Sequence, residues 1–174
     1  MMCGGALGAR WRISSAEQGA GTAAVEVALL ASLFMIIVAG SADFGYWIYA
    51  ASELTAAVSA GSQYAANNGA MVATNPSRLA TAISTVVNNA NGIGWATSTV
   101  NVNNGSSTNC YCPTGTPGNW TWGSAVTCGS ACASGGVAGQ FVTITAGHTA
   151  SPLFPTYQLT YDGAISRSAI VETQ

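Results

Sequence analysis

The chain has 174 residues, enough for one compact domain and an additional membrane anchor. Only 6% of the residues are charged, where a soluble domain usually has about a quarter, and lysine does not occur. The net charge of −2, without a basic patch, argues against nucleic acid as a partner. Because residues 79–161 contain no Asp, Glu, Lys or Arg, we expect no catalytic site, no cofactor and no metal, and therefore no enzyme.

The first predicted element is a helix that crosses a membrane. Residues 27–42 carry no charge, and the apolar character continues past Asp43 to Ala51. A spanning helix needs about 20 apolar residues, so we place the transmembrane part at about residues 25–50. Its far end carries aromatic residues typical of a membrane–water interface, namely Phe44, Tyr46, Trp47 and Tyr49.

The arginines predict how this helix is oriented. Arg10 and Arg12 precede it, and the next basic residue is Arg78. The positive-inside rule therefore predicts a cytoplasmic N-terminus and an external C-terminal part, in a single-pass protein. The alternative is a secretory signal peptide cleaved near residues 40–42. Two features oppose cleavage: the preceding stretch is long and contains acids, and the helical pattern continues past the supposed cut.

The same helix is predicted to extend beyond the membrane. Residues 50–66 are rich in alanine and contain no proline, and Asn67-Asn68-Gly69 is typical of a helix end. We therefore expect one helix over residues 22–66, partly in the membrane and partly outside. Two stripes of small residues could each pack against another helix: Ala24, Ala28 and Ser32, and then Ala57, Gly61 and Ala65. Packing within the chain's own domain explains the second stripe equally well.

Residues 67–174 are predicted to form an external α+β domain. Asn75 and Pro76 are typical of a helix start, and Leu79, Ile83, Val86 and Val87 give that helix an apolar face. Strands are predicted over residues 97–103 and 141–146, and one or two more over residues 158–171, broken near Asp162-Gly163. The expected architecture is a long N-terminal helix followed by a small antiparallel sheet, as in pilins.

A loop over residues 110–132 carries four cysteines: Cys110, Cys112, Cys128 and Cys132. In an oxidising compartment they predict two disulfides. Three pairings are possible, of which the nested one would close a hairpin-like loop. A four-thiolate zinc site is the alternative, but the cysteine spacings depart from the usual ribbon.

The cysteine loop also has a distinct composition. Its prolines and glycines predict no regular structure. Trp120 and Trp122 either offer exposed aromatic surface for adhesion or cap a small core.

Several N-terminal motifs occur together in order. Small residues lead to Val25-Glu26-Val27-Ala28, an aliphatic run follows, and then Asp43-Phe44-Gly45. This arrangement resembles the opening of TadE-like proteins, which are minor pseudopilins of tight-adherence, Flp-type pilus systems. Residues 141–145 and 152–155 also look like the end of such proteins. Val27, where the family usually has Phe, and Tyr46, where a basic residue is common, depart from the pattern.

The resemblance implies processing and partners. An inner-membrane prepilin peptidase would remove the leader, residues 1–21, by cutting after Gly21, with Gly19 as the rival position. Thr22 would then be the first residue and Glu26 the fifth, where its carboxylate could pair with the N-terminal amine of a neighbouring helix. Glu26 could instead simply mark the interfacial start of the helix. Asp43 is expected either to contact another helix or to be solvated at the outer interface.

Two alternative functions are therefore expected. The first is a structural or assembly component of an Flp-type pilus in the bacterial inner membrane, with other pseudopilins and the assembly machinery as partners. The second is a membrane-tethered binding module that uses the tryptophans of the cysteine loop.

Overall fold

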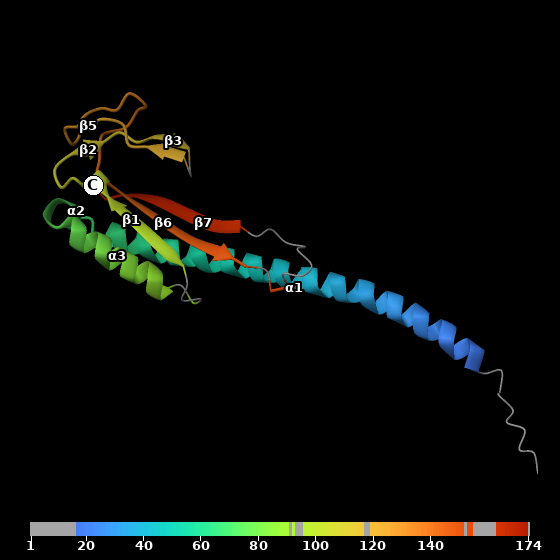
Figure 1. Cartoon of the computed structure of the whole chain (residues 1–174). Coiled ribbons are helices and arrows are strands. Elements are labelled where there is room, and N and C mark those ends of the chain that lie inside the picture. The colour runs from blue at the N-terminus through green and yellow to red at the C-terminus, as the bar shows by residue number, and fades with distance from the viewer. Residues whose placement is uncertain are drawn as a thin grey trace, which may run out of the picture. The chain divides into compact units, whose positions relative to one another are not determined.

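The computed structural model describes residues 17–90, 92, 96–116, 119–151, 153–154 and 163–173 (Figure 1). The predicted leader before residue 17 and the predicted strand portion at 158–162 lie outside these residues. Contacts within the chain define two compact units, Met1–Ser41 and Ala42–Gln174. The first unit contributes only helix to the described part, and the second is an α+β domain, as predicted.

Helix α1, Glu17–Asn67, covers the predicted helix and extends it at the N-terminal end. It ends where predicted, because Asn68 folds back on the last turn. The Asn68 backbone N–H donates to the Tyr64 carbonyl at 3.1 Å, and the Asn68 side-chain amide donates to the same oxygen at 2.9 Å. Among the described residues, this is the one helix long and apolar enough to cross a membrane. Its most apolar 18-residue window has a mean hydropathy of 2.3 and is 6% buried, unlike the core helix of a soluble domain.

Two further helices follow the end of α1. Helix α2, Met71–Thr74, was not predicted, because a single turn has no periodicity to detect. Helix α3, Pro76–Ala90, begins as predicted, since the Arg78 backbone N–H donates to Asn75 Oδ1 at 3.1 Å. Its apolar face is buried in the domain through Leu79, Ile83 and Val87.

A three-stranded antiparallel sheet forms the other layer of the domain. Its strands are β1, Thr97–Val102, β6, Phe141–Ala150, and β7, Gly163–Glu172, in the order β1-β6-β7. Val102 pairs with Val142, and Phe141 pairs with Glu172. The strand predicted over residues 97–103 ends at Val102, because Asn103 and Asn104 take positive φ angles of 46° and 50° and begin the turn η1, Asn103–Gly105.

The core of the domain lies between the sheet and the two long helices. Figure 1 shows α3 beside the C-terminal part of α1, and both helices contribute buried residues to the same cluster as the sheet. Close approach depends on Gly61 in α1, since a Cβ there would lie 2.6 Å from Val87 Cγ2 of α3. The largest fully buried apolar side chains are Leu54, Leu79, Ile83, Ile144, Val72, Val87 and Val142.

The cysteine loop contains more regular structure than predicted. It forms two short antiparallel ribbons: β2, Cys110–Tyr111, pairs with β5, Ala125–Val126, and β3, Thr114–Thr116, pairs with β4, Asn119–Thr121. Proline and glycine exclude long strands, but they still allow ribbons of two or three residues joined by turns. The expectation of an irregular loop was therefore wrong.

Both predicted disulfides are present, with an interlaced rather than a nested pairing. Cys110 bonds to Cys128, and Cys112 bonds to Cys132, with Cα–Cα distances of 4.8 and 5.6 Å. The β2–β5 register explains the pairing. Because Cys110 lies opposite Val126, it comes close to Cys128, whereas Cys112 is displaced toward the other end of the ribbon. Sulfurs bonded to each other cannot serve as the thiolate ligands of the zinc alternative.

Candidate functional site

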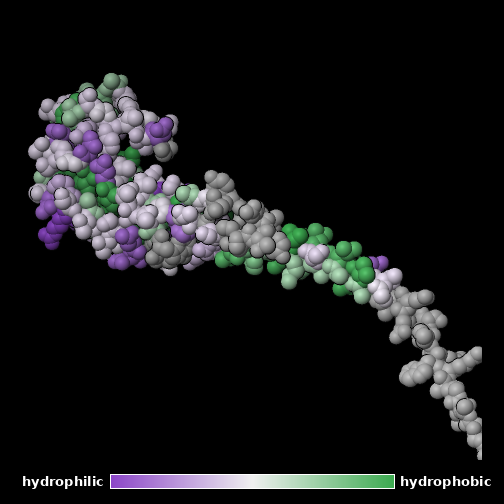
Figure 2. Space-filling model, in the orientation of Figure 1, coloured by the Kyte–Doolittle hydropathy of each residue, from purple (hydrophilic) through white to green (hydrophobic). Residues whose placement is uncertain are grey.

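The most exposed apolar surface lies on the first part of α1. Large side chains over residues 25–38 are exposed, and Figure 2 shows apolar surface on this part of the helix. So much contiguous apolar surface is unfavourable in water and requires lipid or other apolar helices around it. The exposed residues in this segment are Val25, Val27, Leu29, Leu30, Leu33, Phe34, Met35, Ile36, Ile37 and Val38.

The two small-residue stripes have different surroundings. Ala57 and Ala65 are fully buried in the domain, and Gly61 lies against α3 and β6. The second stripe is therefore used for packing within the chain, which was one of its two interpretations. The first stripe, Ala24, Ala28 and Ser32, is exposed. It remains a surface on which another helix could pack.

The residues of the predicted processing site lie at the start of the described side chains. Gly21, Thr22 and Glu26 are all exposed. An added Cβ at Gly21 would meet no neighbouring heavy atom within 4 Å. The role of these residues in processing stays a prediction.

Asp43 has a role that the sequence did not predict. Its side chain is 3% exposed, and Oδ1 accepts a hydrogen bond from the Leu153 backbone N–H at 2.7 Å. The carboxylate therefore holds a loop of the chain's own domain, 110 residues away in sequence. The expected alternatives were contact with another helix and solvation at an interface. No local pattern marks such a contact, since both partners depend on the return of the chain after β6.

The aromatic residues beside Asp43 divide between surface and core. Phe44 and Tyr49 are exposed, whereas Trp47 packs against the hydrophobic core. The predicted interfacial cluster therefore does not act as one surface. Its exposed members lie on the part of α1 that belongs to the folded domain.

The tryptophans of the cysteine loop also have separate roles. Trp122 packs edge-on against Tyr111 at 5.5 Å and against Phe141 at 6.5 Å between ring centroids. It therefore caps a small aromatic cluster. Trp120 lies on β4 opposite Gly115 and is 40% exposed. The capping role therefore applies to Trp122, whereas an adhesion role for the exposed Trp120 stays a prediction.

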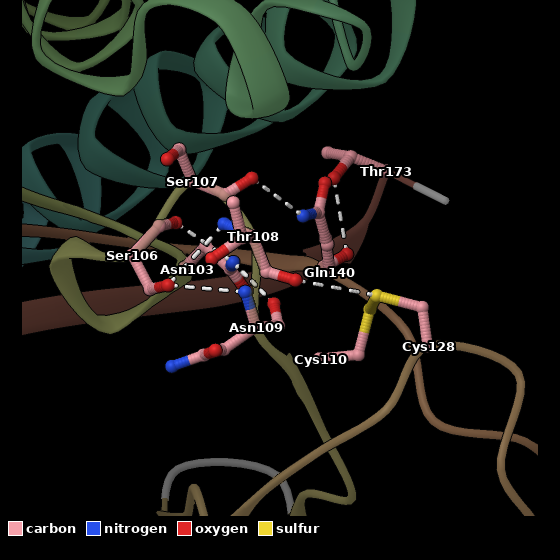
Figure 3. Close-up of a disulfide and its surroundings, with 9 residues drawn as sticks. All are labelled: Asn103, Ser106, Ser107, Thr108, Asn109, Cys110, Cys128, Gln140 and Thr173. Carbon is pink, nitrogen blue, oxygen red and sulfur yellow. Dashed lines mark hydrogen bonds between the residues drawn. A yellow bond between two sulfur atoms is a disulfide. The ribbon is translucent and has the colours of Figure 1, made fainter.

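A polar network attaches the cysteine loop to the sheet (Figure 3). The Asn103 side-chain amide donates to the Ser106 and Asn109 carbonyls at 2.8 and 2.7 Å. The Gln140 amide donates to the Ser107 carbonyl at 3.2 Å. Together these bonds hold the turn that leads into Cys110 against the start of β6. The sequence analysis missed this turn, which the run Asn103-Asn104-Gly105 could have indicated, although that run does not reveal the partners.

Two other contacts complete this region. The Thr173 backbone N–H and hydroxyl donate to the Gln140 carbonyl at 2.8 and 3.0 Å, which fixes the end of β7. Cys128 Sγ lies 3.7 Å from the Thr108 carbonyl oxygen. Because a disulfide sulfur carries no hydrogen, we treat this approach as a van der Waals contact. The first disulfide is thus packed against the turn as well as bonded to β2.

The described structure defines a class: a helix able to anchor a protein in a membrane by a single pass, followed by a small disulfide-bonded α+β domain. Residues 21–63, 43 of the 174 residues, match the family model described as TadE-like protein. The match agrees with the resemblance inferred from the sequence, since its range contains Glu26 and Asp43-Phe44-Gly45. Curated proteins and solved structures gave no match to the chain.

The position of the family match is informative. It begins at Gly21 and runs through the exposed apolar part of α1 into the part buried in the domain. Residues 141–145 and 152–155, which also looked like the family, lie outside the match, so that similarity stays a prediction. The cysteine loop, too, is unmatched.

Proposed function

We propose that the protein is a minor pseudopilin that inserts the first part of α1 among other pilin-like helices during assembly of a tight-adherence, Flp-type pilus. The observation that carries the proposal is the coincidence of the family match with exposed apolar helix. The exposed stripe Ala24, Ala28 and Ser32 would let a neighbouring helix approach closely. The folded domain would then remain outside the helical bundle.

The topology of the proposal places the N-terminus in the cytoplasm and the α+β domain outside the inner membrane. Arg10 and Arg12 support this orientation through the positive-inside rule. The two disulfides support it independently, because such bonds persist in oxidising compartments and are rare in the cytosol. Both observations favour the same orientation.

Glu26 would recognise a neighbouring chain. An unpaired carboxylate at the edge of an apolar helix is costly, and a cationic amine would compensate it. Glu26 is exposed on α1. If a prepilin peptidase cuts after Gly21, the new amine of Thr22 on an adjacent helix would be the partner.

The mass of the mature chain tests the processing step. We expect a mature protein that begins at Thr22. A start at residue 20 would place the cut after Gly19 and make Glu26 the seventh residue of the mature chain, two positions from the proposed fifth. A start at Asp43 would instead mean a cleaved signal peptide, and an intact N-terminus would mean a permanent tether. Either of the last two results would contradict the pseudopilin proposal.

Substitution of Glu26 tests the assembly step. We expect Glu26→Ala to insert in the membrane normally but to be lost from sheared pilus fractions, because the charge pair is missing. Glu17→Ala is the matched control, since Glu17 would be removed with the leader. Normal recovery of Glu26→Ala in the sheared fraction would show that the pair is not needed.

Trp120 favours a second candidate function, a membrane-tethered binding module. Its ring is 40% exposed on a ribbon without charged residues. Under this alternative, the chain stays in the membrane with an unaltered N-terminus, and Trp120→Ala abolishes surface binding. Under the pseudopilin proposal, Trp120→Ala leaves pilus recovery unchanged.

A further inference from the structure

The loop that follows β6 is attached to α1 next to the apolar segment of the helix. The Leu153 backbone N–H donates to Asp43 Oδ1 at 2.7 Å, and Asp43 is 3% exposed. In contrast, the side chains of Leu153 and Phe154 are 55% and 43% exposed. Two adjacent large apolar side chains are therefore exposed to the surroundings, although the hydrogen bond to Asp43 fixes the backbone at Leu153.

The position of Asp43 along α1 indicates what surrounds these side chains. Asp43 lies 17 positions after Glu26, which corresponds to a rise of about 26 Å in a helix. The hydrocarbon core of a bilayer is about 30 Å thick. If Glu26 lies at one edge of the membrane, Asp43 lies close to the other edge. Exposed apolar residues continue on the same helix at Phe44 and Ile48.

We propose that Leu153 and Phe154 enter the outer membrane–water interface and form a second membrane contact beside the helix. This inference rests on the proposed membrane span of α1. Lipid is the occupant that the observations favour, because Asp43, which holds this loop, directly follows the uncharged residues 27–42 along the chain. An aliphatic–aromatic pair also suits the interface, and no charged residue occurs from residue 79 to residue 161 to oppose insertion.

Asp43 acts as a positioning residue in this arrangement. A carboxylate near the membrane is costly unless it has a hydrogen-bond donor. The Leu153 N–H supplies that donor, and Asp43 at the same time fixes the backbone of the two inserting residues. This hydrogen bond satisfies Oδ1 and sets the position of the loop, while the buried Oδ2 has no hydrogen-bond partner among the described residues.

An environment-sensitive label tests the contact with lipid. The full chain, with Cys3→Ser and its disulfides intact, carries the fluorophore NBD on Phe154→Cys and is placed in phosphatidylcholine vesicles. We expect blue-shifted emission and loss of most of the fluorescence when the lipids are brominated. Leu33→Cys labels the proposed span as a positive control, and Thr116→Cys, on exposed β3, is the aqueous control.

The controls separate the possible failures. If the label at 33 is quenched and the label at 154 behaves like that at 116, the loop inference is overturned while the span stands. A label at 154 that is blue-shifted but unquenched is covered by protein, which also overturns it. If the label at 33 is not quenched, the proposed span itself fails.

Variants of Asp43 test whether this residue positions the loop. The measured quantity is the lipid quenching of the fluorophore at position 154. Asp43→Asn keeps a side-chain oxygen that can accept from Leu153 N–H, so we expect quenching to persist. Asp43→Ala removes the acceptor, and we expect quenching to fall toward that of the aqueous control. Unchanged quenching in Asp43→Ala would contradict the positioning role. The mass gain on reduction checks that each variant keeps its disulfides. Membrane contact is decided separately, by the fluorophore at position 154 in the chain that keeps Asp43.

Discussion

The two parts of α1 differ in how they use a similarly apolar sequence. Over residues 25–38 the helix carries large aliphatic side chains around its circumference, and these are exposed. Over residues 50–65 it carries small residues and Leu54 on one face, which is buried, and exposed Ser and Thr on the other. The comparison shows that side-chain size and its distribution decide which part packs in the domain. Only the second part lets α3 and the sheet approach closely.

Alanine substitution of one leucine in each part of α1 should give the largest difference in the free energy of unfolding. Leu54 is fully buried, so Leu54→Ala leaves a cavity and should lower the free energy of unfolding of the domain by about 2–5 kcal/mol. Leu30 is 67% exposed, and Leu30→Ala should leave that free energy nearly unchanged. Urea unfolding of the full chain in detergent, followed by tryptophan fluorescence, measures both. Equal losses would show that the two parts of α1 fold together.

Removal of a disulfide should lower the stability of the α+β domain and leave the membrane anchoring of the helix unchanged. The Cys112–Cys132 bond closes a loop with a sequence separation of 20. The double substitution Cys112→Ser and Cys132→Ser should lower the free energy of unfolding by about 3 kcal/mol, mainly because the unfolded chain gains freedom. The same urea experiment measures this loss, while carbonate extraction of membranes should show unchanged anchoring. Release of the variant from the membrane would contradict the independence of the two parts.

Two helical glycines sharpen the comparison further. A Cβ at Gly61 would approach Val87 Cγ2 to 2.6 Å, whereas a Cβ at Gly45 would meet nothing within 4 Å. Both substitutions to alanine favour the helix, but only Gly61→Ala strains the core. We expect Gly61→Ala to be less stable than Gly45→Ala by about 1–3 kcal/mol in urea unfolding. Equal stabilities would mean that α3 can shift away at no cost.

The smallest expected change in the free energy of unfolding concerns the N-terminal cap of α3, the helix that packs on the second part of α1. Asn75 Oδ1 accepts from the Arg78 backbone N–H, so Asn75→Ala should lower the free energy of unfolding by about 1 kcal/mol. Thr74→Ala is the neighbouring control, because the exposed Thr74 hydroxyl makes only a long bond of 3.4 Å. Thermal unfolding followed by circular dichroism compares the two variants. A larger loss in the control would contradict the capping role.

Local patterns were sufficient for much of the fold. The Asn67-Asn68-Gly69 end of α1, the Asn75 cap of α3 and the strands of the sheet were predicted, because each depends on residues close in sequence. The short ribbons of the cysteine loop were missed, since strands of two or three residues have no period to detect. The single turn α2 was missed for the same reason.

The sequence by itself determined the apolar segment, the family resemblance, the α+β class and the formation of disulfides. Only the tertiary structure decided which stripe of α1 is buried, how the cysteines pair and what Asp43 holds. Stripe burial depends on α3, and the disulfide pairing depends on the β2–β5 register. The bond of Asp43 to Leu153 joins residues 110 positions apart. Such contacts form only when distant segments meet, so no periodicity or spacing within one segment can encode them.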